Sequence, residues 1–284
     1  MTTIQQSIIA EEVERLANKT SQLNLANRLE VSNATVSNMI NGVHENISAA
    51  MWRKVQKILH IEFDWVTAKI KNYQLVYALL KNTQAQSISV AISDDPGKSK
   101  THTYREYETL ENNVIHIECK NSWSKKTYIQ QILINTGCSS IGTTQEMIKR
   151  FVEHVRTLEK PILIIDQFDK LKDPQLDLFM DFYNDLDNQC GFVLSGVKAF
   201  EKRILKGVNR QKIGYAELYS RIGRKFIYLD PISLSDVELI AHKNGVENER
   251  QIRFMYENCQ GDLRRVRRDI EIYNLKREKR KQTA

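Results

Sequence analysis

The sequence predicts an α/β fold placed between two helical regions, and three observations support this prediction. Apolar, β-branched runs alternate with helical segments across residues 87–230, which indicates a parallel sheet flanked by helices. Residues 1–63 show apolar residues only at helical spacing, and residues 64–86 read as a linker and a first helix of the α/β unit. After Asp230-Pro231 the strand pattern stops. Residues 231–284 are therefore expected to form a helical lid with a basic C-terminal tail.

Composition limits the class of protein. The 284 residues are 41% hydrophobic and 27% charged, with only 11 Gly and 4 Pro, which excludes collagen-like and low-complexity chains. The four Cys lie far apart and form no Cys-x-x-Cys pair, which argues against a zinc ribbon or a disulfide framework and favours a reducing cytoplasm. No apolar run is long enough to span a bilayer and no secretion signal is visible, so we expect no membrane partner.

The positive charge is unevenly distributed. The net charge of +7 favours a polyanionic partner such as duplex DNA. Residues 1–63 carry six Lys and Arg against six Glu, whereas residues 261–284 carry nine Lys and Arg against four acidic residues. Most of the excess therefore lies at the C-terminus, where residues 276–284 are expected to fray because they are polar and basic.

Four short helices are expected in the first region, at residues 8–16, 22–29, 33–40 and 49–59. The second and third form a helix-turn-helix pattern. A small Ala26 stands where two helices must approach, Val31 closes the turn, Ser32 caps the following helix, and Val36 and Met39 are expected to point inward.

Short polar side chains occupy the outer face of the third helix and suit contacts with bases and phosphates. They are Asn33, Thr35, Ser37 and Asn38. The segment resembles the helix-turn-helix of the lambda-repressor and Cro family, although Glu30 stands in the turn where that family usually has Gly. The alternative is a helical interaction bundle. Because the region has no net charge, we expect it to bind DNA weakly without tethering or oligomerisation.

The α/β region alternates strands with helical segments. Strands are predicted at residues 87–92, 114–117, 162–165, 192–194 and 226–229. Three lid helices are expected at residues 235–244, 249–258 and 263–279.

A charged loop, Asp94-Asp-Pro-Gly-Lys-Ser-Lys-Thr101, follows the first predicted strand and leads into a helix. It resembles the phosphate-binding P-loop, in which backbone N–H groups wrap phosphates, a Lys reaches the outer phosphates and a hydroxyl binds magnesium. Lys100 and Thr101 then hold the chemical positions. Gly97 is retained, while Asp94 and Ser99 replace the two defining glycines.

A second register of this loop is centred on Gly97-Lys98-Ser99. It would place Ile92, inside the strand, where the first glycine belongs. We therefore prefer the register with Lys100.

A carboxylate ends the next apolar strand, in Ile162-Leu-Ile-Ile-Asp166. Such an Asp holds the magnesium shell in P-loop ATPases. The following residue is Gln167, where a catalytic Glu is usual. A Gln can orient water but cannot take its proton. We therefore expect slow hydrolysis of ATP, unless Asp169 or a partner supplies the carboxylate.

Three further polar positions follow in order. Ser195 ends a strand, Arg221 and Arg224 lie in Ser220-Arg-Ile-Gly-Arg224 before the last strand, and Arg264 opens the last helix. In order and spacing they resemble the sensor 1, arginine-finger and sensor 2 positions of AAA+ ATPases.

The AAA+ resemblance implies a parallel sheet with a small helical lid, and ATP and Mg as ligands. It also implies a homo-oligomer in which Arg221, with Arg224 as second choice, reaches the γ-phosphate of a neighbouring subunit, while Arg264 senses the phosphate in its own. For Arg267 and Arg268 we favour a solvated basic face or a DNA contact.

The combination of a Cro-like headpiece with one AAA+ module resembles phage Mu transposition protein B, and more loosely TnsC, over nearly the whole chain. Two stretches carry the likeness: residues 166–171, Asp-Gln-Phe-Asp-Lys-Leu, and residues 217–226. The resemblance implies an ATP-dependent protein that forms helical filaments or rings on duplex DNA, captures target DNA and activates a transposase. The alternatives are a repressor-like regulator with an ATPase sensor, a loader of the replication-initiator type, and a scaffold without ATPase activity.

A filament on DNA needs backbone contacts that every subunit repeats. Residues 120–126 combine charge, short polar groups and Trp123 after the second strand. Lys125 and Lys126 are the first candidates for these contacts, and a solvated helix start is the alternative.

Overall fold

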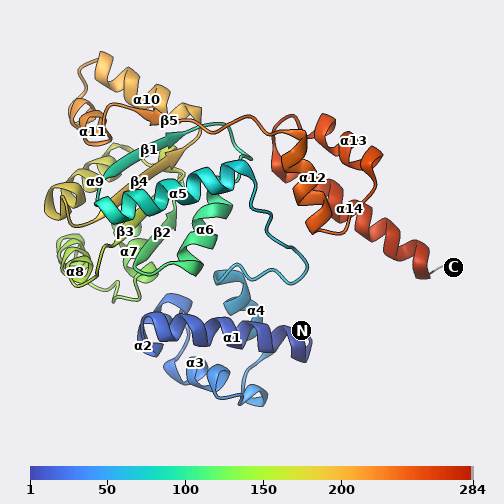
Figure 1. Ribbon diagram of the computed structural model, residues 1–284. Helices are drawn as coiled ribbons and strands as arrows, with labels where there is room; N and C mark the ends of the chain where they lie inside the picture. Colours follow the sequence, from blue (N-terminus) through green and yellow to red (C-terminus); the bar gives the residue numbers. More distant parts are fainter. Residues whose placement is uncertain (283–284) are drawn as a thin grey trace.

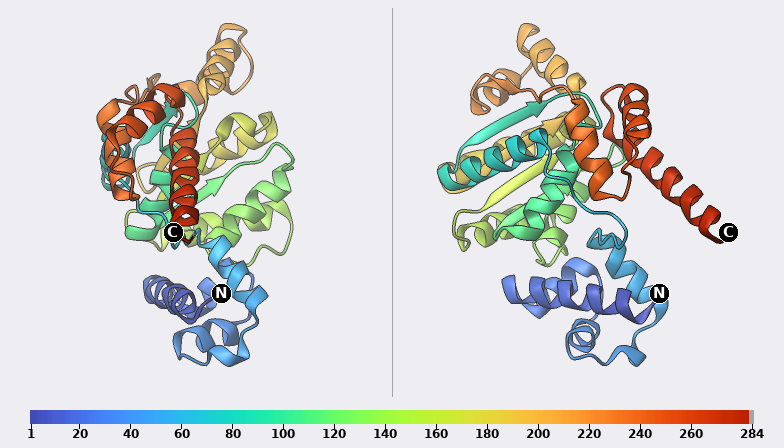
Figure 2. Two further views of the ribbon diagram at one scale, coloured as in Figure 1. Left: turned by 90° about the vertical axis from the view of Figure 1, so that its right-hand side faces the viewer. Right: turned by 45° about the vertical axis from the view of Figure 1, so that its right-hand side comes forward.

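The computed structural model describes residues 1–282, with side chains to residue 280, and shows three parts in sequence order (Figure 1). A small helical domain lies at one end, the α/β domain forms the centre, and a helical lid follows. The last helix of the lid extends away from the rest of the molecule, as Figure 1 and the right-hand view of Figure 2 show. Within the described residues, no helix combines the length and the apolar character needed to cross a membrane.

The N-terminal domain consists of α1 (Thr3–Lys19), α2 (Gln22–Leu29), α3 (Asn33–Ile40), a short 3-10 turn and α4 (Ala49–Ile58). Its core surrounds the fully buried Trp52. The Ser32 hydroxyl accepts a hydrogen bond from the Thr35 backbone N–H and so begins α3. The expected inward positions, Val36 and Met39, are buried.

The turn between α2 and α3 contains the predicted departure from the usual glycine. Glu30 adopts a left-handed conformation with φ of 52°. Its carbonyl oxygen accepts a hydrogen bond from Lys54 of α4 at 2.5 Å. The conformation favours glycine, so the glutamate carries a cost of about 1–2 kcal/mol.

The central sheet has five parallel strands in the order β2-β3-β4-β1-β5. They are β1 (Ser89–Ser93), β2 (Val114–Glu118), β3 (Ile162–Asp166), β4 (Gly191–Gly196) and β5 (Phe226–Ile227). All five strands predicted from the sequence are present. The first begins two residues later than expected because Ser87, in a left-handed conformation, ends the preceding helix, and the last is two residues shorter.

The side chains of each strand alternate between two helical layers. Ile162 and Ile164 pack with α5 (Lys71–Gln86) and α6 (Lys100–Leu110), whereas Leu163 and Ile165 belong to the larger cluster on the opposite face. That face is covered by α7 (Lys125–Asn135), α8 (Thr144–Arg156), α9 (Asp173–Leu186) and α10 (Lys198–Asn209). Because β3 is buried on both faces, it is apolar throughout until Asp166.

The lid contains α12 (Leu234–Lys243), α13 (Glu249–Cys259) and α14 (Leu263–Gln282). The expectation that residues 276–284 fray is wrong for residues 276–282, which continue α14 as a helix. Lys, Arg, Glu and Gln are good helix formers, so this polar composition is compatible with a projecting helix. Thr283 and Ala284 lie outside the described residues.

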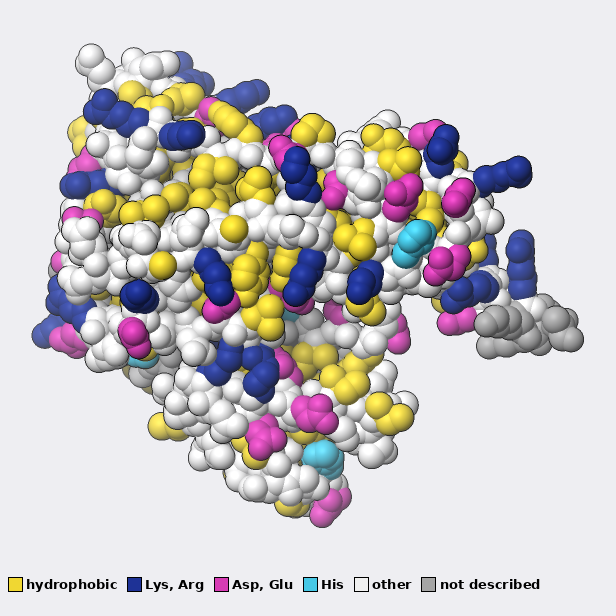
Figure 3. Space-filling model, in the orientation of Figure 1, with side chains coloured by type: hydrophobic (Ala, Val, Ile, Leu, Met, Phe, Trp, Pro, Cys, Tyr) yellow, Lys and Arg dark blue, Asp and Glu magenta, His cyan; other side chains and the backbone are white. Residues whose placement is uncertain are grey.

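The helix-turn-helix domain is docked on the α/β domain through basic side chains. Arg28 of α2 pairs with Glu108 of α6 at 3.0 Å, and Lys19 donates to the carbonyl oxygen of Thr109 at 2.7 Å. Arg15 reaches the same carbonyl at 2.5 Å. Figure 3 shows Lys and Arg side chains gathered at this junction. These cations lie at the C-terminal end of α6, where the helix dipole favours positive charge.

Candidate nucleotide site

A cavity of about 570 Å³ opens between the C-terminal edge of the sheet and the lid. Its volume is in the range of small-molecule sites. Polar residues of the lining come from the loop before α6, from α6 itself, from the strand ends of the sheet, and from the linker and the lid. The apolar part comes from the linker after the helix-turn-helix domain and from the lid; it comprises Trp65, Ala68, Ile70, Ile240 and Leu263.

Lys100 is the first residue of α6 and is 8% exposed. Its ammonium donates to the backbone carbonyl oxygens of Asp94 at 3.0 Å and Asp95 at 2.8 Å, inside the loop. Burial lowers its pKa, while the nearby carboxylates of Asp166 and Asp94 raise it. The cation is thus held within the cavity at a helix N-terminus, which is a suitable place for a phosphate group.

The Thr101 hydroxyl donates to Oδ2 of Asp166 at 2.5 Å, which joins the start of α6 to the end of β3. Within residues 1–282, no cluster of three or more His, Cys, Asp and Glu side chains forms a metal site by itself. Mg²⁺ is usually bound by one or two protein ligands and completes its shell with water and phosphate oxygens. A hydroxyl and a carboxylate in contact therefore fit the ion, which would neutralise the phosphate charge when bound.

Asp166 is buried, and burial raises the pKa of its carboxyl although Thr101 and the backbone N–H of Gln167 lower it by hydrogen bonding. Gln167 lines the cavity with φ of 57°, and its side-chain oxygen accepts a hydrogen bond from Lys170. Ser195 is fully buried at the end of β4, beside Asp166 and Tyr104. Its hydroxyl has no hydrogen-bond partner in the described part of the chain.

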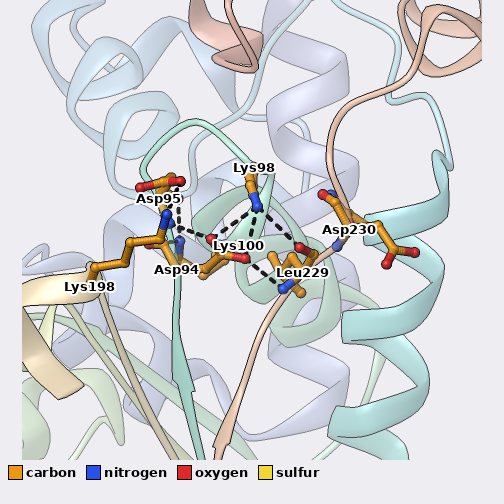
Figure 4. A network of polar contacts seen from close by, with 8 residues as sticks. Asp94, Asp95, Lys98, Lys100, Lys198, Leu229 and Asp230 are labelled. Carbon is orange, nitrogen blue, oxygen red and sulfur yellow. Dashed lines mark hydrogen bonds and ion pairs between the residues drawn. The ribbon is translucent and has the colours of Figure 1, made fainter.

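Asp94 stands where a P-loop usually has its first glycine, and it is a structural anchor here. Both of its carboxylate oxygens accept from Lys98 at 2.9 Å, and Oδ2 also accepts from the backbone N–H of Leu229 at 2.6 Å (Figure 4). Burial raises the pKa of Asp94, but Lys98 and the Leu229 N–H lower it overall. The Lys98 ammonium is thus bound to a carboxylate, whereas the Lys100 ammonium is bound to backbone carbonyl oxygens.

The same network reaches the connection between sheet and lid. Lys98 also donates to the carbonyl oxygen of Leu229 at 3.1 Å, and the next residue, Asp230, exchanges two 3.0 Å hydrogen bonds with Asn72 of α5. Figure 4 shows how Asp94 and Lys98 join the loop to this segment. The loop, the lid connection and α5 are therefore held together by buried polar contacts.

Ser99 and Gly97 both adopt a left-handed backbone conformation, but they differ in what surrounds them. Ser99 has φ of 72°, a conformation that favours glycine. Gly97 has φ of 78° and contacts the lid directly. Its carbonyl oxygen accepts a hydrogen bond from the Leu263 N–H at 3.0 Å. A Cβ added at Gly97 would come 2.0 Å from Oδ1 of Asp262. The retained glycine is thus required by contact with the lid.

The linker and the lid close the cavity together. Arg267 pairs with Glu62 at 2.8 Å and lies over the Trp65 ring at 4.7 Å, and both Arg264 and Arg267 line the cavity. Arg267, expected on a solvated basic face or at a DNA contact, is bound to the linker while its side chain stays 39% exposed, and the DNA contact remains a prediction. Arg268 is exposed.

Arg221 and Arg224 are absent from the part of the lining drawn from the described residues. Arg221 ends α11 (Tyr215–Arg221), lies over the ring of Tyr183 at 4.9 Å and contacts Glu217 at 3.4 Å. Arg224 is exposed, with φ of 53°. Neither reaches the cavity of its own chain.

The candidate DNA contacts lie on two separate surfaces. Asn33 is exposed, and Thr35, Ser37 and Asn38 are half-buried on α3, which lies on the outer side of the helix-turn-helix domain (Figure 1). Lys125 and Lys126 open α7, whose first turn is capped by Ser124. Trp123 packs against the core and the Tyr128 ring, so it is not a free aromatic surface.

Several cavity residues were not expected from the sequence. Glu62, Trp65 and Arg267 come from the linker and the lid, and Arg105 and Glu118 from α6 and β2. Only Glu118 had a signal, because a carboxylate that ends an apolar run is the same pattern that identified Asp166. The others are ordinary surface residues in the sequence.

Residues 86–204 match the AAA domain family model, and residues 13–66 match a helix-turn-helix model. No curated protein matches the sequence. Most of the α/β domain is therefore similar to the AAA domain family, and most of the N-terminal domain is similar to helix-turn-helix domains.

Solved structures similar to this chain include the following three. One is described as a DNA replication initiation factor, with 16% identity, a TM-score of 0.48, and coverage of 78% of this chain and 67% of that one. The Orc1 protein of Aeropyrum pernix in complex with DNA has 14% identity, a TM-score of 0.49, and coverage of 72% and 58%. The RuvB Holliday junction branch migration motor of Thermotoga maritima has 16% identity, a TM-score of 0.39, and coverage of 72% and 70%.

Proposed function

We propose that the protein binds Mg-ATP in this cavity and uses it as a switch for assembly on duplex DNA, where it captures target DNA for a partner transposase. The observation that carries the proposal is the meeting of Lys100, Thr101 and Asp166 in one cavity beneath the lid. An ammonium, a hydroxyl and a carboxylate in this order serve a triphosphate and its magnesium ion. The apolar lining from linker and lid suits a nucleotide base.

Assembly is supported by the positions of the arginines. Arg264 lines the cavity of its own chain, whereas Arg221 and Arg224 lie outside it, and the exposed Arg224 could meet a neighbouring copy. A site completed by a second subunit makes nucleotide binding and oligomerisation depend on each other. The filament or ring would place the start of α7, with Lys125 and Lys126, against the DNA backbone in every subunit.

The transposition role is supported by the likeness of residues 166–171 and 217–226 to the phage Mu protein B group. A repressor-like regulator is the second candidate, because the polar face of α3 remains on the outside of the docked domain. The two differ in DNA preference: a target-capture protein binds most duplexes alike, whereas a regulator prefers one sequence by several orders of magnitude.

Electron microscopy of the full-length protein on duplex DNA tests the proposal, with ATP, with ADP and with Lys100→Ala. We expect ATP-dependent filaments or rings on unrelated sequences, and loss of both assembly and nucleotide affinity, by about 100-fold, in Lys100→Ala. Calorimetry that finds no uptake of Mg-ATP by the folded protein would overturn it. Strong preference for one DNA sequence without assembly would favour the regulator.

A further inference from the structure

The position that usually holds a catalytic Glu is occupied by Gln167, whose amide cannot accept a proton from water. The cavity nevertheless contains carboxylates other than Asp166. Glu118, from the end of β2, and Asp169, from the turn after β3, both line it. Glu62 also lines it, but it comes from the segment after α4 and not from a strand end beside Asp166.

The Asp169 carboxylate binds the backbone at the end of β4. Its Oδ1 accepts a hydrogen bond from the backbone N–H of Val197 at 3.2 Å. It also packs tightly against Gly196, where an added Cβ would lie 2.7 Å from the same oxygen. This carboxylate therefore fastens the turn after β3 to the end of β4.

Glu118 is placed beside Asp166 by the register of the sheet. The two are paired residues of β2 and β3, and the next ladder bond, from the Cys119 N–H to the Asp166 carbonyl oxygen, measures 3.0 Å. Neighbouring strands lie about 4.8 Å apart, and paired residues project to the same face. His116, two residues earlier, meets the Tyr104 ring of α6 edge to face, so Glu118 belongs to the α6 face, as does Asp166.

Electrostatics and packing agree with this placement. Glu118 is close enough to Asp166 to raise the pKa of that carboxyl, after the larger effect of burial. Its Oε1 accepts a hydrogen bond from Nε of Arg105 at 2.7 Å and forms an ion pair with the same guanidinium at 2.6 Å, which orients the carboxylate at the cavity wall. The side chain is 27% exposed and therefore accessible to water in the cavity.

We propose that Glu118 is the general base for ATP hydrolysis in this protein, in place of the missing Glu at position 167. The inference rests on the proposed binding of Mg-ATP. In the step, the oxygen of a water molecule bonds to the γ-phosphorus and its proton passes to the Glu118 carboxylate. The bond from the γ-phosphorus to the bridging oxygen breaks, and its electron pair stays on the β-phosphate of ADP. The proton then leaves Glu118 with the inorganic phosphate or to solvent.

Glu118→Gln in the full-length protein tests this role, because the amide keeps the size of the side chain and an acceptor for Arg105. Two quantities are measured with duplex DNA present: the dissociation constant for Mg-ATP by calorimetry, and the single-turnover hydrolysis rate between pH 5 and pH 9. We expect hydrolysis to fall about 100-fold while the dissociation constant changes less than about threefold.

Asp169→Asn is the matched variant of the other candidate carboxylate. Thermal melting checks that each variant is folded. The inference is overturned if Glu118→Gln hydrolyses ATP at the wild-type rate, if the rate falls with Asp169→Asn and not with Glu118→Gln, or if the wild-type protein binds Mg-ATP without hydrolysing it. Absence of Mg-ATP binding by the wild-type protein would instead contradict the proposed function itself.

Discussion

The helix-turn-helix domain and the nucleotide cavity are assembled in opposite ways. The first draws its whole core and its helix caps from residues 1–63, and its recognition face has no charged residue. The second gathers linker, loop, strand ends and lid, from Glu62 to Arg267, around buried charges. Local apolar packing thus determines the first, whereas long-range polar contacts determine the second. Substitutions in the two regions should therefore affect different properties.

The largest effect is expected from Lys98→Ala. The substitution leaves the Asp94 carboxylate, 2% exposed, without its cationic partner, and should destabilise the α/β domain by about 3 kcal/mol. Lys100→Ala, two residues away, should leave stability less affected and remove nucleotide affinity. Urea denaturation and calorimetry of both variants measure the contrast. Equal loss of stability in both would contradict the separate roles of the two lysines.

A second prediction concerns pH. Burial lowers the pKa of His116 in β2 to about 3, with smaller contributions from Arg105 and His60. The folded protein keeps this ring neutral while the unfolded chain protonates it near pH 6.5. The stability from His116 is therefore present above pH 6.5 and is lost as the pH falls toward 3.

Between pH 7 and pH 5, His116 should cost the wild-type α/β domain about 2 kcal/mol of stability. His116→Phe keeps a ring against Tyr104 and should remove that part of the slope. Urea denaturation at both pH values measures it. An unchanged slope in the variant would show that the ring is protonated in the folded protein.

The third prediction separates the two candidate DNA surfaces. Lys125→Ala with Lys126→Ala should weaken binding about tenfold at 0.1 M salt and reduce the slope of log affinity against log salt by about 2. Asn33→Ala with Asn38→Ala is the uncharged control on α3 and should leave that slope unchanged. Fluorescence anisotropy over a salt series measures both. An identical slope in the lysine variant would remove α7 from the DNA interface.

The same contrast explains what the sequence could predict. The helices at residues 22–29 and 33–40 occur at the predicted residues, because Ser32, Val36 and Met39 act within one or two turns of chain. Likewise, Lys100 and Asp166 lie in characteristic local patterns, and the structure brings them together. The linker contacts of Arg267 could not be predicted, because nothing near it in the chain indicates a partner 205 residues away. Similarly, the role of Asp94 as an anchor depends on Leu229, which approaches it only in the folded sheet.

The smallest effect tests how local the first region is. Ser32→Ala removes the acceptor for the Thr35 N–H at the start of α3 and should cost about 1 kcal/mol. Because the cap touches only its own helix, the loss should appear in the unfolding of the helix-turn-helix domain, with Mg-ATP affinity unchanged. Ser32→Asp restores a capping oxygen and serves as the control. Arg28 and Glu108 join this domain to α6, the helix that begins with Lys100. A weaker Mg-ATP affinity in Ser32→Ala would therefore mean that this junction transmits the order of α3 to the nucleotide site.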